Sequence, residues 1–229
     1  MKITFSEPKP VDKHWVAVAV AGDGTLRGEA AALDQRLGGA VTRAIDAMAF
    51  KAERGKVTSF VAPSGALKGV ILVGTGKPEE LNADRVAQLG GAIFAQGAAV
   101  NAAEVAVMVD ETAAGPLKIA DAAAQLAFGM QLRSYRFGKY RTTAKNGAPS
   151  LKKATVMAKG MAAARKAHAD LDSLANAVSF TRDIVTEPAN VLYPDSYAKI
   201  IDQTLSPLGV KVEILDEKDM AKLGMGSLL

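Results

Sequence analysis

One segment has the composition of a phosphate-binding loop. Gly74-Thr-Gly-Lys77 follows an apolar run and ends in a lysine. A phosphate loop needs four residues between its first glycine and a Gly-Lys-Ser/Thr triplet, so that backbone N–H groups surround the phosphate. Here Pro78 follows the lysine, and the third glycine of a dinucleotide fingerprint is missing at the required offset. The spacing therefore favours a plain strand-to-helix turn.

The two histidines of the chain, His14 and His168, are candidate metal ligands. His168 lies in a helical pattern with Asp170 and Asp172 nearby, but the spacing without a second histidine is not that of a zinc site. His14 lies beside Trp15 at the edge of an expected strand. A lone histidine is commonly structural or solvated, and this is the interpretation we favour for both.

Three carboxylates lie close together in Asp216, Glu217 and Asp219. Paired carboxylates can support acid–base catalysis, but these lie at an expected helix start, where they would cap N–H groups and favour the helix dipole. No Gly-x-Ser-x-Gly motif occurs, and the chain has no cysteine, which excludes thiol catalysis and disulfides. From these residues alone, the sequence contains no catalytic constellation.

Basic residues are concentrated between positions 131 and 170, where Asp170 is the only acidic residue. The stretch 133–166 contains Arg133, Arg136, Lys139, Arg141, Lys145, Lys152, Lys153, Lys159, Arg165 and Lys166. Such a run is most often a solvated face. The alternative is a surface that binds a polyanion such as nucleic acid.

The composition limits the class of protein. The chain has 229 residues, a net charge of +4 and 49% hydrophobic residues, which is enough for a sizeable core. No apolar run approaches the roughly 18 residues of a membrane span. The N-terminus has no signal-peptide pattern. Together with the absence of cysteine, this predicts a cytoplasmic protein with no membrane partner.

The elements that would position these residues alternate between strands and helices. Short apolar runs predict strands at residues 2–5, 14–21, 56–62, 69–74, 104–110 and 152–158. Longer amphipathic or alanine-rich stretches predict two short helices within 29–50, broken near Gly38, and helices at 83–99 and 119–132, the first of which is capped by Asn82. Pro63-Ser-Gly65 is expected to turn, and 141–151 to form a polar loop. This alternation predicts a parallel or mixed sheet with helices on both faces.

A long helix is expected from about Gly160 to Glu187, followed by a corner at Glu187-Pro-Ala-Asn190. About 27 residues would span roughly 40 Å, which suits a strut between two domains. Pro188 ends the helix because it lacks an N–H group and disfavours helical angles at the residue before it. The expected buried face carries small and apolar residues at spacings of three and four, namely Ala167, Leu171, Leu174, Ala175, Val178, Thr181 and Val185.

A new set of elements is predicted after Asn190. Pro194 suits the first position of a helix that Pro207 and Gly209 end. The segment 209–215 alternates between apolar and polar residues, as in a half-exposed or edge strand. Asp216 begins a short helix that ends at Gly224. One helix, one strand and one helical turn cannot bury a core of their own.

Several blocks of this sequence resemble the leucyl aminopeptidase family, the two-metal cytosolic aminopeptidases. The blocks are Val70-Ile-Leu-Val-Gly-Thr-Gly-Lys-Pro-Glu-Glu80, Tyr135-Arg-Phe-Gly-Lys-Tyr140, Thr181-Arg-Asp-Ile-Val-Thr-Glu-Pro-Ala-Asn190 with Val-Leu-Tyr-Pro194, and Leu215-Asp-Glu-Lys-Asp-Met-Ala-Lys-Leu-Gly-Met-Gly226. The chain departs from the family at Tyr193, where a threonine or serine often caps the helix; loss of such a cap costs about 1 kcal/mol. Within the family, a structural corner is still the favoured role for Glu187-Pro-Ala-Asn190.

The resemblance implies a fold and a division into domains. It implies an α/β protein: a macro-domain-like mixed sheet flanked by helices at 1–158, a linking helix and corner at 159–190, and the first elements of a catalytic α/β domain at 191–229. Macro-domain likeness does not by itself imply nucleotide binding.

The resemblance also implies a function for a longer parent protein. Members of the family remove N-terminal residues from peptides with two divalent metal ions, zinc or manganese, and assemble as hexamers. The family's metal ligands and catalytic residues lie in motifs that this sequence lacks, so no catalytic, metal or cofactor residue is assigned here. We expect the chain alone to be inactive and to serve assembly or regulation, and the alternative is a nucleic-acid-binding module that uses 133–166.

Overall fold

The computed structural model describes residues 1–62, 65–142 and 149–229. The chain divides into two compact units, Met1–Ser179 and Phe180–Leu229. Parts of the turn expected at Pro63-Ser-Gly65 and of the loop expected at 141–151, including Lys145, lie outside the described residues. In the described part of the chain, no helix has both the length and the apolar composition needed to cross a bilayer.

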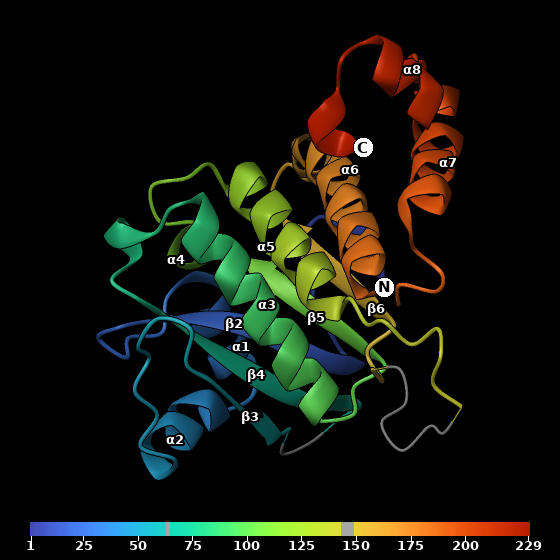
Figure 1. Cartoon of the computed structure of the whole chain (residues 1–229). Helices are drawn as coiled ribbons and strands as arrows, with labels where there is room; N and C mark the ends of the chain where they lie inside the picture. Colours follow the sequence, from blue (N-terminus) through green and yellow to red (C-terminus); the bar gives the residue numbers. More distant parts are fainter. Residues whose placement is uncertain (63–64, 143–148) are drawn as a thin grey trace. The chain divides into compact units, whose positions relative to one another are not determined.

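The first unit is built around one sheet, in which the described residues form six strands (Figure 1). The strand order is β1-β6-β5-β2-β4-β3. All neighbouring strands are parallel except β3, which pairs antiparallel with β4. The strands are β1 (Lys2–Ser6), β2 (His14–Ala21), β3 (Val57–Val61), β4 (Leu67–Gly76), β5 (Glu104–Val109) and β6 (Lys153–Ala158). The mixed sheet expected from the sequence is confirmed.

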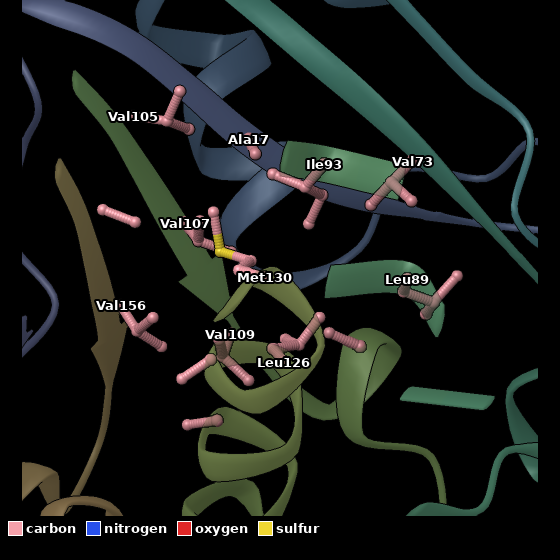
Figure 2. Packing of buried hydrophobic residues seen from close by; sticks show 14 of the residues in the cluster. Ala17, Val73, Leu89, Ile93, Val105, Val107, Val109, Leu126, Met130 and Val156 are labelled. Carbon is pink, nitrogen blue, oxygen red and sulfur yellow. The ribbon is translucent and has the colours of Figure 1, made fainter. Parts of the chain in front are cut away.

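Helices cover both faces of the sheet, and each face has its own core (Figure 1). One core contains the buried side chains of α3 (Ala83–Ala99) and α5 (Ile119–Ser134), and the other those of α1 (Gly28–Arg36) and α2 (Ala40–Ala47). In the first core, the α5 side chains Leu126 and Met130 pack near Val107 and Val109 of β5 (Figure 2). The central strands are apolar on both faces because both faces are covered.

Two glycines allow α3 and α5 to approach closely. A Cβ atom at Gly90 would lie 2.1 Å from the carbonyl oxygen of Leu126, and one at Gly129 would lie 1.8 Å from that of Ala87. Real Cβ atoms do not approach backbone so closely, so any larger residue would push the helices apart. The two glycines therefore determine how closely these helices pack.

Some short elements differ from the sequence-based expectation. β4 continues through Thr75 to Gly76 instead of ending at Gly74. A 3-10 turn, η1 (Pro78–Glu80), and a short helix, α4 (Glu111–Ala114), were not expected from the sequence. Both are too short to show a hydrophobic period.

The long helix is present as α6 (Met161–Thr186), and it ends before Pro188 as predicted. Glu7 caps its start, because its carboxylate accepts hydrogen bonds from the N–H groups of Met161, at 2.9 Å, and Gly160, at 3.3 Å. The predicted buried face is wrong in part: Leu174 is 50% exposed and Val185 is 79% exposed. The buried residues are Ala164, His168 and Ala175. The predicted face was based on small and apolar residues alone. It therefore did not include His168, which has a hydrogen-bonding partner in the folded protein.

The second unit consists of helices and turns. It contains α7 (Pro194–Leu205), η2 (Ser206–Leu208), α8 (Glu217–Lys222) and η3 (Gly226–Leu228). The strand predicted at 209–215 is wrong: residues 210–216 are fully described and form no strand. An alternating segment becomes a strand only when a neighbouring strand supplies hydrogen bonds.

The start of α7 has a capping group that the sequence analysis missed. Tyr193 precedes the helix and its side chain gives no cap, as expected. Ser196 compensates in part, because its hydroxyl oxygen accepts a hydrogen bond from the N–H of Tyr193 at 2.9 Å. This is one half of a capping box.

Candidate functional site

A ligand site in this sheet is expected at the carboxyl ends of β2 and β5. The chain leaves β2 toward β4 on one side and leaves β5 toward β6 on the other. In open α/β sheets, ligands bind in the crevice at such a point. Whether this sheet binds a ligand there depends on the side chains and N–H groups at the carboxyl ends of β2 and β5.

Asp110 follows β5 and lies at this end of the sheet. One carboxylate oxygen accepts hydrogen bonds from the N–H groups of Thr112, at 3.0 Å, and Ala113, at 3.2 Å. The other accepts from the N–H of Glu29, at 2.8 Å, in the first turn of α1. Asp110 is only 8% exposed, and it fastens α1 to the end of β5. The sequence analysis missed this role, although an Asp directly after a buried strand is a recognisable helix cap.

Gly28 fits this arrangement closely. It has a φ of +50°, and a Cβ atom there would lie 2.2 Å from a carboxylate oxygen of Asp110. A side chain at position 28 would thus both strain the backbone and displace the carboxylate.

A pocket of about 470 Å³ lies between α1 and α2, beside the loop after β2, and Asp34 and Thr42 contribute to its lining. Asp34 accepts hydrogen bonds from the N–H groups of Val41, at 2.7 Å, and Thr42, at 3.1 Å, and from the Thr42 hydroxyl at 2.6 Å. Burial raises the pKa of Asp34, but these hydrogen bonds outweigh it and hold the pKa below its usual value. The first N–H groups of α2 therefore already have an anionic partner within the chain.

Gly74-Thr-Gly-Lys77 forms the end of β4 and not a phosphate loop. The N–H of Gly74 donates to the carbonyl of Lys56 at 2.8 Å, and that of Gly76 donates to the carbonyl of Ala52 at 3.0 Å. Lys77 lies 3.7 Å from Glu80 in an ion pair. The N–H groups of Gly74 and Gly76 thus already donate hydrogen bonds within the protein. This agrees with the interpretation of the motif as a turn after a strand and not as a phosphate-binding loop.

His14 belongs to a charged cluster at the amino ends of the strands. Its Nε2 atom lies 3.7 Å from one carboxylate oxygen of Glu104, and the other carboxylate oxygen accepts a hydrogen bond from Lys153 at 2.6 Å. Burial raises the pKa of Glu104, but the hydrogen bond and charge of Lys153, assisted by His14, lower it below its usual value. The cluster links the first residues of β2, β5 and β6.

The side chain of His168 contacts residues of α5 and β1. Its Nε2 atom lies 2.9 Å from the side-chain oxygen of Gln131 in α5, and its ring lies 5.2 Å from that of Phe5. The amide of Gln131 also donates to Asp172. Burial lowers the pKa of His168, although the charge of Asp172 acts in the opposite direction. The histidine therefore connects α6 to α5 and β1.

The carboxylates near the C-terminus act as caps. Asp216 accepts a hydrogen bond from the N–H of Asp219 at 2.9 Å, and Asp219 in turn pairs with Lys222 at 3.0 Å. The capping interpretation is confirmed for Asp216. At Glu187-Pro-Ala-Asn190, the carbonyl of Pro188 accepts hydrogen bonds from the N–H groups of Val191 and Leu192, both at 2.9 Å, so this segment is a turn.

The basic residues of 133–166 lie on several elements. Arg133 is in α5, and Arg165 and Lys166 are in α6. Lys152 and Lys159 flank β6 at opposite ends, and seven residue steps place them about 23 Å apart. The described basic residues thus do not lie on one helix or strand, and Lys153 is already paired with Glu104.

The described residues do not fit a metal pair. Among them, no three His, Cys, Asp or Glu side chains come close enough to hold a metal ion. We therefore assign no step of metal chemistry to them.

Two family models match the chain in succession. The model described as the N-terminal domain of the cytosol aminopeptidase family matches residues 17–144. The model described as the catalytic domain of the same family matches residues 179–229.

Curated relatives match over nearly the whole chain. A probable cytosol aminopeptidase of Caulobacter vibrioides is 39% identical over 236 residues, which cover 100% of this chain and 46% of that protein. A probable cytosol aminopeptidase of Brucella suis is 38% identical and covers 99% of this chain and 45% of that protein. The chain thus spans less than half the length of these relatives.

Solved structures share the fold. A tomato leucine aminopeptidase mutant matches with a TM-score of 0.81 and 19% identity, over 98% of this chain and 46% of that one. The bottromycin maturation enzyme BotP in complex with Mn matches with a TM-score of 0.68 and 22% identity, over 92% of this chain and 40% of that one. These similarities confirm the fold class expected from the sequence.

Proposed function

The chain belongs to the cytosol aminopeptidase family, and on that basis we propose that it is the N-terminal portion of a metallopeptidase that removes N-terminal residues from peptides. The observation that carries the proposal is the order of the two family matches. The match to the N-terminal domain comes first in the chain, and the match to the catalytic domain begins within α6.

The chain by itself is proposed to be inactive. The catalytic-domain match is limited to residues 179–229. The remainder of that domain would supply the metal ligands and the groups that act on the peptide bond, while this chain serves assembly or regulation. Two divalent ions, zinc or manganese, would activate water and polarise the scissile carbonyl in the complete enzyme. The manganese complex of BotP supports manganese as one candidate.

The remaining parts of the proposal concern organisation and location. We propose three segments: 1–158 as the N-terminal domain, 159–190 as the linking helix and corner, and 191–229 as the start of the catalytic domain. The two family matches support an N-terminal domain followed by a catalytic domain, and the catalytic-domain match already begins at residue 179 within the segment 159–190. A cytoplasmic homohexamer without membrane partners is the assembly and location that the family resemblance implies. Nucleic-acid binding is not proposed, because the family match gives it no support and the basic residues lie on separate elements.

The test is hydrolysis of leucine p-nitroanilide. The purified chain should give no more product than buffer containing the same concentration of Zn²⁺ or Mn²⁺. The complete Caulobacter vibrioides relative serves as the positive control. Metal-dependent hydrolysis by the 229-residue chain alone would show that the proposed division of labour is wrong.

A further inference from the structure

A second pocket of the first unit lies where α1 meets the loop after β1 and the strand β5. Its volume is about 280 Å³, close to the lower limit for sites that bind small molecules. The loop contributes Pro8, Lys9 and Pro10 to its lining, and β5 contributes Met108. A ligand in this pocket would therefore contact three segments that are far apart in the sequence.

The side of α1 that faces this pocket carries two opposite charges. Its lining residues are Glu29, Ala32, Leu33 and Arg36. Residues at these spacings lie on one side of a helix and form a stripe along it. Glu29 lies at the start of the stripe and Arg36 at its end. The pocket thus has an anionic group at one end of the stripe, a cationic group at the other, and apolar side chains between them.

The charged groups of this pocket are not neutralised by neighbours. In the part of the chain that the structure describes, no ion pair involves Glu29, Arg36 or Lys9. The guanidinium of Arg36 donates one hydrogen bond to the carbonyl of Val11 at 2.8 Å. Because a guanidinium has five N–H donors, it can still bind an anion.

The helix α1 is held at both ends, so the stripe is formed before a ligand binds. At its start, the N–H of Glu29 donates to Asp110 at 2.8 Å. At its end, Arg36 donates to Val11. In the loop that faces the stripe, Pro8 and Pro10 each restrict a backbone angle. A site that is already formed costs less conformational entropy on binding.

The separation of the two charges indicates the class of ligand. Seven residue steps of helix place Glu29 and Arg36 about 10 Å apart along the axis. A free amino acid carries its ammonium and carboxylate on one carbon atom, so it is too short to contact both side chains where they leave the helix. An extended dipeptide spans about 7 Å, and a hydrogen bond of about 2.8 Å at each end makes it long enough for both.

We propose that this pocket binds a short peptide with free termini and apolar side chains, of which a dipeptide is the smallest that fits. The ammonium group of the peptide pairs with Glu29, and its carboxylate pairs with Arg36, assisted by Lys9. Its apolar side chains contact Ala32 and Pro10, which are both exposed. This site goes beyond the proposed function and does not rest on it, because all lining residues belong to the first unit and binding requires no hydrolysis.

Titration of the isotope-labelled 229-residue chain with the dipeptide Leu-Leu tests the proposal. The NMR shifts of backbone amides should change saturably, and the largest changes should fall at residues 9, 29–36 and 108. The titration extends to about 10 mM, where a site with a Kd of about 1 mM is about nine-tenths occupied. No saturable change up to that concentration, or changes centred on other residues, would overturn the proposal.

Blocked peptides test the two charges separately. N-acetyl-Leu-Leu lacks the ammonium group, and Leu-Leu amide lacks the carboxylate. Each should bind at least about 10-fold more weakly than Leu-Leu, because a hydrogen bond between charged groups is lost. Leucine should also bind at least about 10-fold more weakly, since it reaches one charge at a time. If either blocked peptide bound as tightly as Leu-Leu, apolar contact alone would account for binding and the proposal would be wrong.

A matched pair of variants tests the role of Glu29. Glu29→Gln should weaken the binding of Leu-Leu by about 10-fold. It should change the binding of N-acetyl-Leu-Leu by less than about twofold, because that peptide has no ammonium group to pair. Glu79→Gln removes the same charge in η1, outside the pocket lining, and should affect neither peptide. An equal loss for both peptides in Glu29→Gln would show that this residue acts through the fold, which would contradict the assigned contact.

Discussion

At the scale of single residues, buried polar groups join separate elements of the first unit. Asp110 connects β5 to the first turn of α1, and His168 connects α6 to α5. Each is buried, and each has a hydrogen-bonding partner far away in sequence. Because an unpaired polar group in a protein interior costs free energy, these contacts are expected to determine local stability.

The lowered pKa of His168 predicts a dependence of stability on pH. The buried ring stays neutral at pH values where the unfolded chain, with a pKa near 6.5, binds a proton. Stability should therefore be complete above pH 6.5 and decrease as the pH falls below it, toward the lowered pKa of the folded state. Melting temperatures between pH 7.5 and 5.5 measure this effect.

The variant His168→Gln is the control for this titration. It keeps a hydrogen-bonding group near Gln131 but cannot bind a proton. Its melting temperature should vary less over the same pH range than that of the original chain. An equal pH dependence in both proteins would assign the effect to other groups.

Replacement of Asp110 should destabilise the first unit. Asp110→Ala leaves three N–H groups without their carboxylate, and we expect a loss of about 2 kcal/mol in the free energy of unfolding. Urea denaturation followed by circular dichroism measures it. Asp216→Ala, which removes a cap in the coreless second unit, should leave the main transition unchanged. A similar loss in both variants would argue against the special role of Asp110.

At the scale of elements, the packing of α3 against α5 depends on glycines at the crossing. Gly90 and Gly129 leave no room for a Cβ atom against the backbone of the opposite helix. Gly91 also faces α5, but a Cβ atom there would lie at an ordinary contact distance of 3.7 Å from the Cβ atom of Arg133 and the carbonyl oxygen of Gly129. The three glycines are similar in sequence context, and only their position in the crossing distinguishes them.

This difference gives a matched pair of substitutions. Gly129→Ala should lower the free energy of unfolding by about 3 kcal/mol, because the helices must separate or bend. Gly91→Ala should raise it by up to about 1 kcal/mol, since alanine favours the helix. Thermal unfolding measures both. A stabilised Gly129→Ala variant would contradict the close approach of the helices.

At the scale of the whole molecule, stability should reside in the first unit. The two hydrophobic cores have no buried member beyond Ala164, and residues 180–229 contain no buried side chain. Deletion of residues 188–229 should therefore change the melting temperature by less than about 3 °C, which corresponds to about 1 kcal/mol for a domain of this size.

A shorter deletion variant is the contrast. A chain that ends at residue 159 loses α6, with Ala164 and His168, and should unfold at a much lower temperature or fail to fold. If the chain of residues 1–187 were also strongly destabilised, the second unit would have to contribute to the main cooperative transition.

Elements with local signals could be predicted from the amino-acid sequence. Continuous apolar runs identified the central strands, Asn82 and Asp216 identified helix caps, and Pro188 identified the end of α6. The blocks that resemble aminopeptidases identified the family. These features depend on neighbours in the chain, so they can be read without knowledge of the fold.

Features that depend on residues far away in the sequence became visible only in the tertiary structure. It showed that His168 is buried because Gln131 lies opposite it, and that Asp110 fastens a helix 81 residues away in sequence. It also showed that Val210–Leu215 forms no strand, although its alternation is that of one. A strand requires a neighbour to complete its hydrogen bonds, and no sequence pattern within the segment can supply that neighbour.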